Sequence, residues 1–230
     1  MTEEEWNAGS ETYFPRKMLW ALEEQFAPKR LKAARAARGR KLRLFASAAI
    51  RRIWHLLAFD ELKMLVDVSD RFADQTATRV HLRAAMKKAC ANRTEALGGL
   101  SGARYYAERA VWLLGEEKIS EHIVGLVEDI FGATVNDPDN PEEEGKHQQH
   151  FLRDIFGNPF RPVAFDPAWR AEHAVGIAAK MYDERHFAAM PILADALEEA
   201  GCDSADILAH CREPGVHVRG CWVVDLVLGK

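Results

Sequence analysis

The last twenty-one residues, HCREPGVHVRGCWVVDLVLGK (210–230), concentrate the side chains of this chain that could bind a metal ion or perform catalysis. Two histidines and two cysteines, His210, Cys211, His217 and Cys221, fall within twelve residues. Imidazole nitrogen and thiolate sulfur are preferred donors for Zn²⁺, and structural zinc sites use four donors in a tetrahedron. The stretch is therefore either a metal or catalytic site or the apolar end of a helical domain.

The spacing of these residues favours one pair over the others. His210 and Cys211 are adjacent, so on one helix they point about 100° apart and cannot both face one ion. His217 and Cys221 are four residues apart, which places both on one face of a helix. With Cys211 or Cys202 as a further donor, they form the metal-site hypothesis. The alternative, which the sequence favours, is that the cysteines are small core residues and His217 caps or packs at a helix start.

Enzyme signatures are missing elsewhere in the sequence. It contains no H-E-x-x-H, C-x-x-C or G-x-S-x-G motif, and GGLSG (98–102) lacks the Lys-Ser/Thr of a phosphate loop. YDERH (182–186) collects charged groups, but a solvated helix end explains it better than acid–base machinery does. His173 lies on an apolar stripe with Trp169 and Ile177, which is typical of a core histidine. We expect no cofactor and lean towards a protein that is not an enzyme.

A basic segment, residues 29–52, stands out against the net charge of −4. No acidic residue occurs between Glu24 and Asp60, while ten cations do. They are Lys29, Arg30, Lys32, Arg35, Arg38, Arg40, Lys41, Arg43, Arg51 and Arg52. Such a helix could neutralise phosphates without reading sequence, although its basic core has no aromatic residue for base stacking. Alternatively, it docks on an acidic surface of a partner or of the same chain, for example Glu142 to Glu144.

The bulk composition bounds the class of protein. With 230 residues, 48% hydrophobic and 29% charged, the chain can bury a core as an ordinary globular protein. The start, MTEEEWNAGSE, has no signal-peptide features, and no run of 18 apolar residues occurs, so we expect no membrane partner. Four cysteines are too few for a disulfide framework, which predicts reduced thiols in a cytoplasm.

Apolar residues recur at helical spacing nearly throughout, so the sequence predicts a mainly α fold, a compact multi-helix bundle with two helical subdomains as an option. Residues 15–26 and 41–59 show this period most clearly. NDPDNPEEEGKHQQH (136–150) has two prolines and no apolar residue, and it predicts a loop or linker. The predicted division is an N-terminal helical region (1–135), this linker, and a C-terminal helical domain (151–230).

Several motifs at both ends carry a resemblance. LRDIFGNPFRPV (152–163), PILADALEEAGC (191–202), DILAHCR (206–212), HVRGCWVVDLVLGK (217–230) and MTEEEW (1–6) resemble an uncharacterised bacterial family found as many paralogues in planctomycete-type genomes. The likeness covers about half of the chain. This chain departs from the family pattern at ASAAIRR (46–52), where the family has a cysteine-rich ACACCRR, and at RAEHAVG (170–176). The first departure argues against a shared metal site there, and the family implies no activity.

Three functions follow as expectations. The first is a non-catalytic, cytoplasmic helical interaction or regulatory module that acts through a protein partner, with a helical frame presenting a variable middle. The second is a nucleic-acid-associated protein that binds the phosphate backbone through residues 29–52. The third is a metal-binding protein centred on His217 and Cys221, with Cys211.

Overall fold

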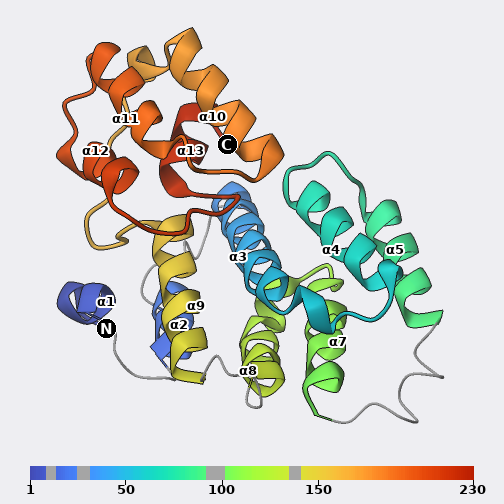
Figure 1. Cartoon of the computed structure of the whole chain (residues 1–230). Helices are drawn as coiled ribbons and strands as arrows, with labels where there is room; N and C mark the ends of the chain where they lie inside the picture. Colours follow the sequence, from blue (N-terminus) through green and yellow to red (C-terminus); the bar gives the residue numbers. More distant parts are fainter. Residues whose placement is uncertain (9–13, 25–31, 92–101, 135–140) are drawn as a thin grey trace. The chain divides into compact units, whose positions relative to one another are not determined.

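The computed structural model describes residues 1–8, 14–24, 32–91, 102–134 and 141–230 (Figure 1). Within these ranges all regular structure is helical, with twelve α-helices and three short 3-10 helices. The prediction of a mainly α fold is confirmed. None of the described helices is both long and apolar enough to cross a membrane.

The chain divides into two units, Met1–Leu152 and Arg153–Lys230. The division falls inside helix α9 (Pro141–Phe156), so the predicted loop over residues 136–150 is wrong from Pro141 onward. Residues 136–140 lie outside the described ranges. Proline at the first helical position and three glutamates in the first turn favour a helix start here. The helix buries polar side chains, Glu144, Gln148 and Gln149, which is why its hydropathy resembles that of a loop.

The N-terminal unit is built around one long helix, α3 (Lys32–Arg52). It packs against α4 (Asp60–Ala73), α7 (Ala103–Leu114) and α8 (Ile123–Thr134), and the last two lie along each other. The large apolar residues of α3, among them Leu42, Phe45 and Ile50, are fully buried. The remaining elements are α1 (Glu3–Ala8), α2 (Phe14–Glu24), η1 (Trp54–Leu56), α5 (Arg79–Ala91), η2 (Ile119–Glu121) and the first turns of α9.

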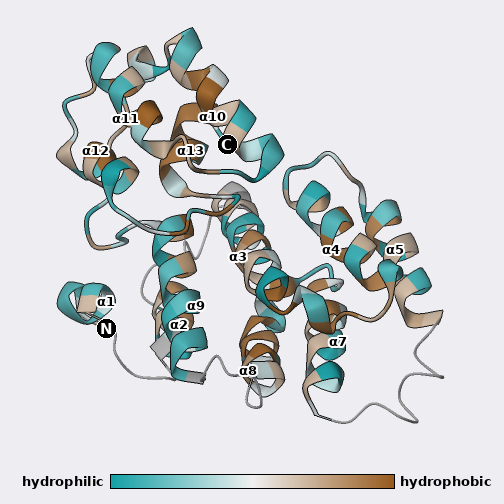
Figure 2. Ribbon diagram, in the orientation of Figure 1, coloured by the Kyte–Doolittle hydropathy of each residue, from teal (hydrophilic) through white to brown (hydrophobic). Residues whose placement is uncertain are grey.

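The C-terminal unit contains η3 (Pro167–Trp169), α10 (Glu172–Glu184), α11 (Met190–Glu199), α12 (Ala205–Arg212) and α13 (Trp222–Leu228). Helix α10 packs on α11 and α13, and α11 packs on α12. Figure 2 shows the apolar residues on α10, α11 and α13, and they form one buried cluster.

Asp166 caps the start of η3, because its side chain accepts a hydrogen bond from the Ala168 N–H. The helix breaks after Trp169, however, and α10 restarts at Glu172. Helix α10 buries Ala174, Ala178 and Met181, which leaves His173 beside the buried face and exposed, so the prediction of a core histidine is wrong.

Candidate metal centre

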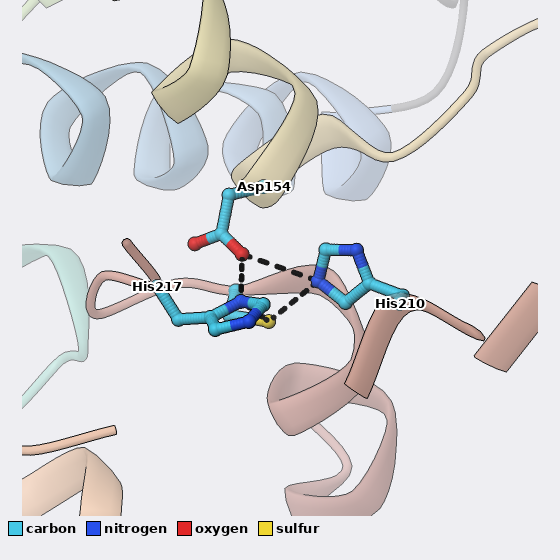
Figure 3. Close-up of side chains that lie close together, drawn as sticks. Asp154, His210 and His217 are labelled. Atoms are coloured by element: carbon cyan, nitrogen blue, oxygen red, sulfur yellow. Dashed lines mark hydrogen bonds and ion pairs between the residues drawn. The ribbon is translucent and has the colours of Figure 1, made fainter. Parts of the chain in front are cut away.

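Four metal-ligating side chains of the C-terminal unit converge on one point (Figure 3). Asp154 comes from the last turn of α9 and His210 from the last turn of α12. His217 and Cys221 come from the irregular segment that joins α12 to α13. One ligand atom from each residue lies within 4.8 Å of the other three.

The distances between these atoms match those of a coordination shell. Asp154 Oδ1 is 3.1 Å from His210 Nε2 and 2.7 Å from His217 Nδ1. Cys221 Sγ is 3.2 Å from His210 Nε2 and 3.9 Å from His217 Nδ1. Tetrahedral zinc ligands, bound at about 2.0–2.3 Å, stand about 3.3–3.8 Å from one another. Each separation differs from this range by about 1 Å or less, so modest side-chain shifts would place all four atoms on one ion.

The surrounding backbone orients the carboxylate. Asp154 Oδ2 accepts a hydrogen bond of 2.8 Å from the Val218 N–H, which leaves Oδ1 facing the two imidazole rings. Helix α9 ends just before Gly157, whose φ of +67° is a conformation that glycine adopts without strain. A Cβ at that position would lie 3.3 Å from the ring of Trp222. The Trp222 ring in turn packs against His210, with 5.1 Å between ring centroids.

The surroundings shift the pKa values of the Asp154 carboxyl and the Cys221 thiol in opposite directions. Burial alone would raise the pKa of the Asp154 carboxyl, but hydrogen bonds from His210 and His217 outweigh it and lower the pKa to about 2. Burial raises the pKa of the Cys221 thiol well above its ordinary value, and the nearby Asp154 carboxylate raises it further. A divalent cation with one carboxylate, one thiolate and two neutral imidazoles carries no net charge, which suits a centre where Asp154 and Cys221 are buried.

The same residue types could form a Cys–His–Asp catalytic triad, but the geometry differs. A triad uses both nitrogens of one imidazole, one towards the nucleophile and one towards the carboxylate. Here His210 approaches both Asp154 and Cys221 through Nε2, and His217 approaches both through Nδ1. In the described part of the chain, His217 Nε2 has no hydrogen-bond partner. Cys221 is fully buried with a raised pKa, unlike a nucleophilic thiol.

The structure brings the predicted pair His217 and Cys221 together, although on an irregular segment and not on a helical face. Cys211 lies in the apolar core and not in the cluster, and burial raises its pKa to about 12. His210 and Cys211 thus point in different directions, as adjacent positions on a helix require. Asp154 was not predicted. The sequence offers one hint: this aspartate lies beside residues of the apolar face of α9, such as Leu152 and Ile155.

The basic segment 29–52 is engaged largely within the N-terminal unit. Arg38 pairs with Glu23, Arg40 with Asp74 at 3.0 Å, and Arg51 with Asp67 and Asp70. Arg52 donates to Glu144 at 2.8 Å, which is one of the acidic residues named as a docking surface. Lys29 and Arg30 lie outside the described residues, as does the side chain of Lys32. Arg35 is exposed and Lys41 is half-buried.

Arg43 is the most buried cation among the described residues of this segment. Its guanidinium donates to Ser69 Oγ and to the backbone carbonyls of Leu114, Glu116 and Glu117. Burial lowers the pKa of Arg43 to about 10. Arg43 therefore binds the carbonyl end of α7 and not an external phosphate.

Comparison with known proteins found no match: no protein-family model, no curated protein and no solved structure matches this chain. The family resemblance of the terminal motifs stays an expectation. Function is therefore inferred from the geometry and chemistry of the four converging side chains.

Proposed function

We propose that this protein binds one divalent transition-metal ion, zinc by preference, through Asp154, His210, His217 and Cys221. The observation that carries the proposal is the convergence of four donor atoms within 4.8 Å of one another. One carboxylate, two imidazoles and one thiolate suit Zn²⁺, whereas Mg²⁺ and Ca²⁺ prefer oxygen ligands throughout. Cys221 can bind the ion only as a reduced thiol, and it is a free cysteine. A cytoplasmic location, which keeps thiols reduced, belongs to the same proposal.

The donor set favours a structural ion over a catalytic one. Catalytic zinc sites keep one coordination position open for water or substrate, whereas structural sites take all four ligands from the protein. Here the protein offers four donors, and two of the ligands, Asp154 and Cys221, are buried. The ion would join the end of α9, the end of α12 and the segment before α13. This role agrees with a protein that has no catalytic activity of its own.

Metal analysis of the purified full-length chain tests this proposal. After equilibrium dialysis against Zn²⁺, we expect one zinc per chain, and strong loss of zinc in Cys221→Ser and His217→Ala. Cys90→Ser and His173→Ala are the matched controls, because these residues lie outside the cluster. Circular dichroism checks that each variant is folded. Zinc well below one equivalent in the unaltered chain would overturn the proposal.

A role as an interaction module with a protein partner is a second proposal, favoured by one surface of the N-terminal unit. Trp20 on α2 is 59% exposed and lines a pocket of about 380 Å³ together with Leu19, Ile123 and Val124. Arg16 and Arg38 also line this pocket and are paired with Glu128 and Glu23. A partner segment that fits carries an apolar side chain for the pocket. Selection from a displayed peptide library should enrich such segments on the unaltered chain and not on Trp20→Ala. Equal enrichment on both proteins would contradict this second proposal.

A further inference from the structure

The four ligands of the proposed metal centre differ in how far they reach solvent. The side chain of His210 is 18% exposed, against 7% for His217 and 1% for Asp154. Cys221 is fully buried and belongs to the apolar core cluster of the C-terminal unit. Solvent therefore reaches the centre most readily beside the imidazole of His210.

Helix α12 explains the exposure of His210. Its buried residues, Ile207 and Cys211, are four apart and anchor one face of the helix in the apolar core. Asp206 and Ala209 are exposed, so His210 lies where the buried face of the helix meets the exposed face. A change in the side-chain torsion angles of His210 therefore moves its ring towards solvent while the buried face of α12 stays in place.

Asp154 and His217 are held more firmly than His210. Asp154 Oδ2 accepts from the Val218 N–H at 2.8 Å, and Oδ1 lies 2.7 Å from His217 Nδ1. His210 Nε2 stands further from the same Oδ1 atom, at 3.1 Å. The His210 ring otherwise packs against the rings of His217 and Trp222, with centroids 4.9 and 5.1 Å away. Displacing this ring leaves the bonds that join Asp154 to His217 and Val218 intact.

From these observations, and resting on the proposed function, we infer that the position of His210 is the exchangeable coordination position of the metal centre. The ion enters and leaves on this side, and an imidazole from outside takes the fourth position when His210 is displaced. Three protein ligands and one replaceable donor are the arrangement with which zinc accepts a ligand from outside. In the exchange one zinc–nitrogen bond breaks and another forms, so the ion keeps four donors and an unchanged charge.

Chemical rescue by imidazole tests this inference in the full-length chain. His210→Gly and His217→Gly each remove one imidazole ligand, but the space left by His210 is the more open to solvent. Titration with Co²⁺, followed by absorption spectroscopy, measures the affinity with and without millimolar imidazole. Relative to the unaltered chain, which corrects for imidazole bound to free Co²⁺, we expect imidazole to raise the affinity of His210→Gly by roughly tenfold or more and to leave that of His217→Gly nearly unchanged. Circular dichroism checks that both variants are folded.

A second measurement needs no variant. Zinc transfer from the unaltered chain to the chelator pyridylazoresorcinol should have a rate that rises in proportion to the chelator concentration, because the chelator attacks the bound ion at the exchangeable position. A rate independent of chelator concentration would overturn the inference and leave zinc binding intact. The same holds for a rescue of His210→Gly that is no greater than that of His217→Gly. Failure of the unaltered chain to bind zinc at all would instead overturn the proposed function.

Discussion

Two polar regions of this molecule, helix α3 and the metal centre, handle their charges differently. Along α3, five arginines each have their own acidic or carbonyl partners, as in Arg40 with Asp74 and Arg52 with Glu144. In the metal centre, four side chains aim one ligand atom each at the same point. Pairwise contacts neutralise charge and leave little to bind an external ligand. Convergent contacts leave a common point that one cation can occupy.

Burial of a charged group has a different consequence in each region. Arg43 is buried by α3 and its neighbours, and its guanidinium is shared among a hydroxyl and three carbonyls. Asp154 is buried to a similar extent, but the groups that hold it, His210 and His217, are themselves ligands of the proposed metal centre. We therefore expect Arg43 to act in stability alone and Asp154 to act in both stability and binding.

Replacing Arg43 gives the largest expected effect on stability. Arg43→Met keeps much of the side-chain stem but leaves the buried Leu114 carbonyl and two part-buried carbonyls without their donor, so we expect the free energy of unfolding to fall by about 3–5 kcal/mol. Urea denaturation measures this change. Arg35→Met on the exposed part of the same helix should stay within about 0.5 kcal/mol. Equal losses of unfolding free energy at the two positions would contradict this stabilising role of Arg43.

Asp154→Asn, measured in metal-free protein, tests how much Asp154 contributes to the free energy of unfolding. Because the folded pKa of about 2 lies below the ordinary value, the carboxylate stabilises the fold above about pH 4 and loses this effect as the pH falls towards 2. We expect Asp154→Asn to lower the free energy of unfolding by about 2 kcal/mol at pH 7. The difference from the unaltered chain should shrink in acid, and a difference that is constant with pH would argue against this account.

Glu108 on α7 is a buried carboxyl with the opposite behaviour. It is 1% exposed, Oε1 has no hydrogen-bond partner among the described residues, and burial raises its pKa. A raised pKa in the folded state means that stability falls as the pH rises above about 4. Glu108→Gln should raise the free energy of unfolding at pH 7 by up to about 1 kcal/mol. Thermal denaturation at pH 7 and pH 4 tests this, with the gain confined to the higher pH.

The smallest expected effect concerns nucleic acid. Ten phosphate contacts would give a slope near −9 in a plot of log affinity against log salt. Because Arg38, Arg40, Arg43, Arg51 and Arg52 are engaged within the chain, we expect weak binding to duplex DNA with a much shallower slope. Binding across a salt series measures it. A steep slope that is lost on Arg35→Glu would instead favour the nucleic-acid function.

The helical class and the pair His217 and Cys221 were accessible from the sequence because they depend on short-range patterns. Asp154 was not, since it lies 56 residues before His210 and no local spacing links them. The pairing of Arg52 with Glu144, 92 residues apart, was only one of several docking options for the same reason. The helix over residues 141–150 was missed because its buried face is polar, and periodicity of apolar residues cannot register it.

The measurement that tests the central claim most directly is a titration of the metal-free chain with Co²⁺, followed by absorption spectroscopy. Four protein donors that include one thiolate predict visible bands typical of tetrahedral Co²⁺ and a sulfur-to-metal charge-transfer band, both saturating at one equivalent. Zinc should abolish both, and Cys221→Ser should lack the charge-transfer band. Weak bands typical of octahedral Co²⁺, unchanged in Cys221→Ser, would contradict the assignment of these four side chains as one metal centre.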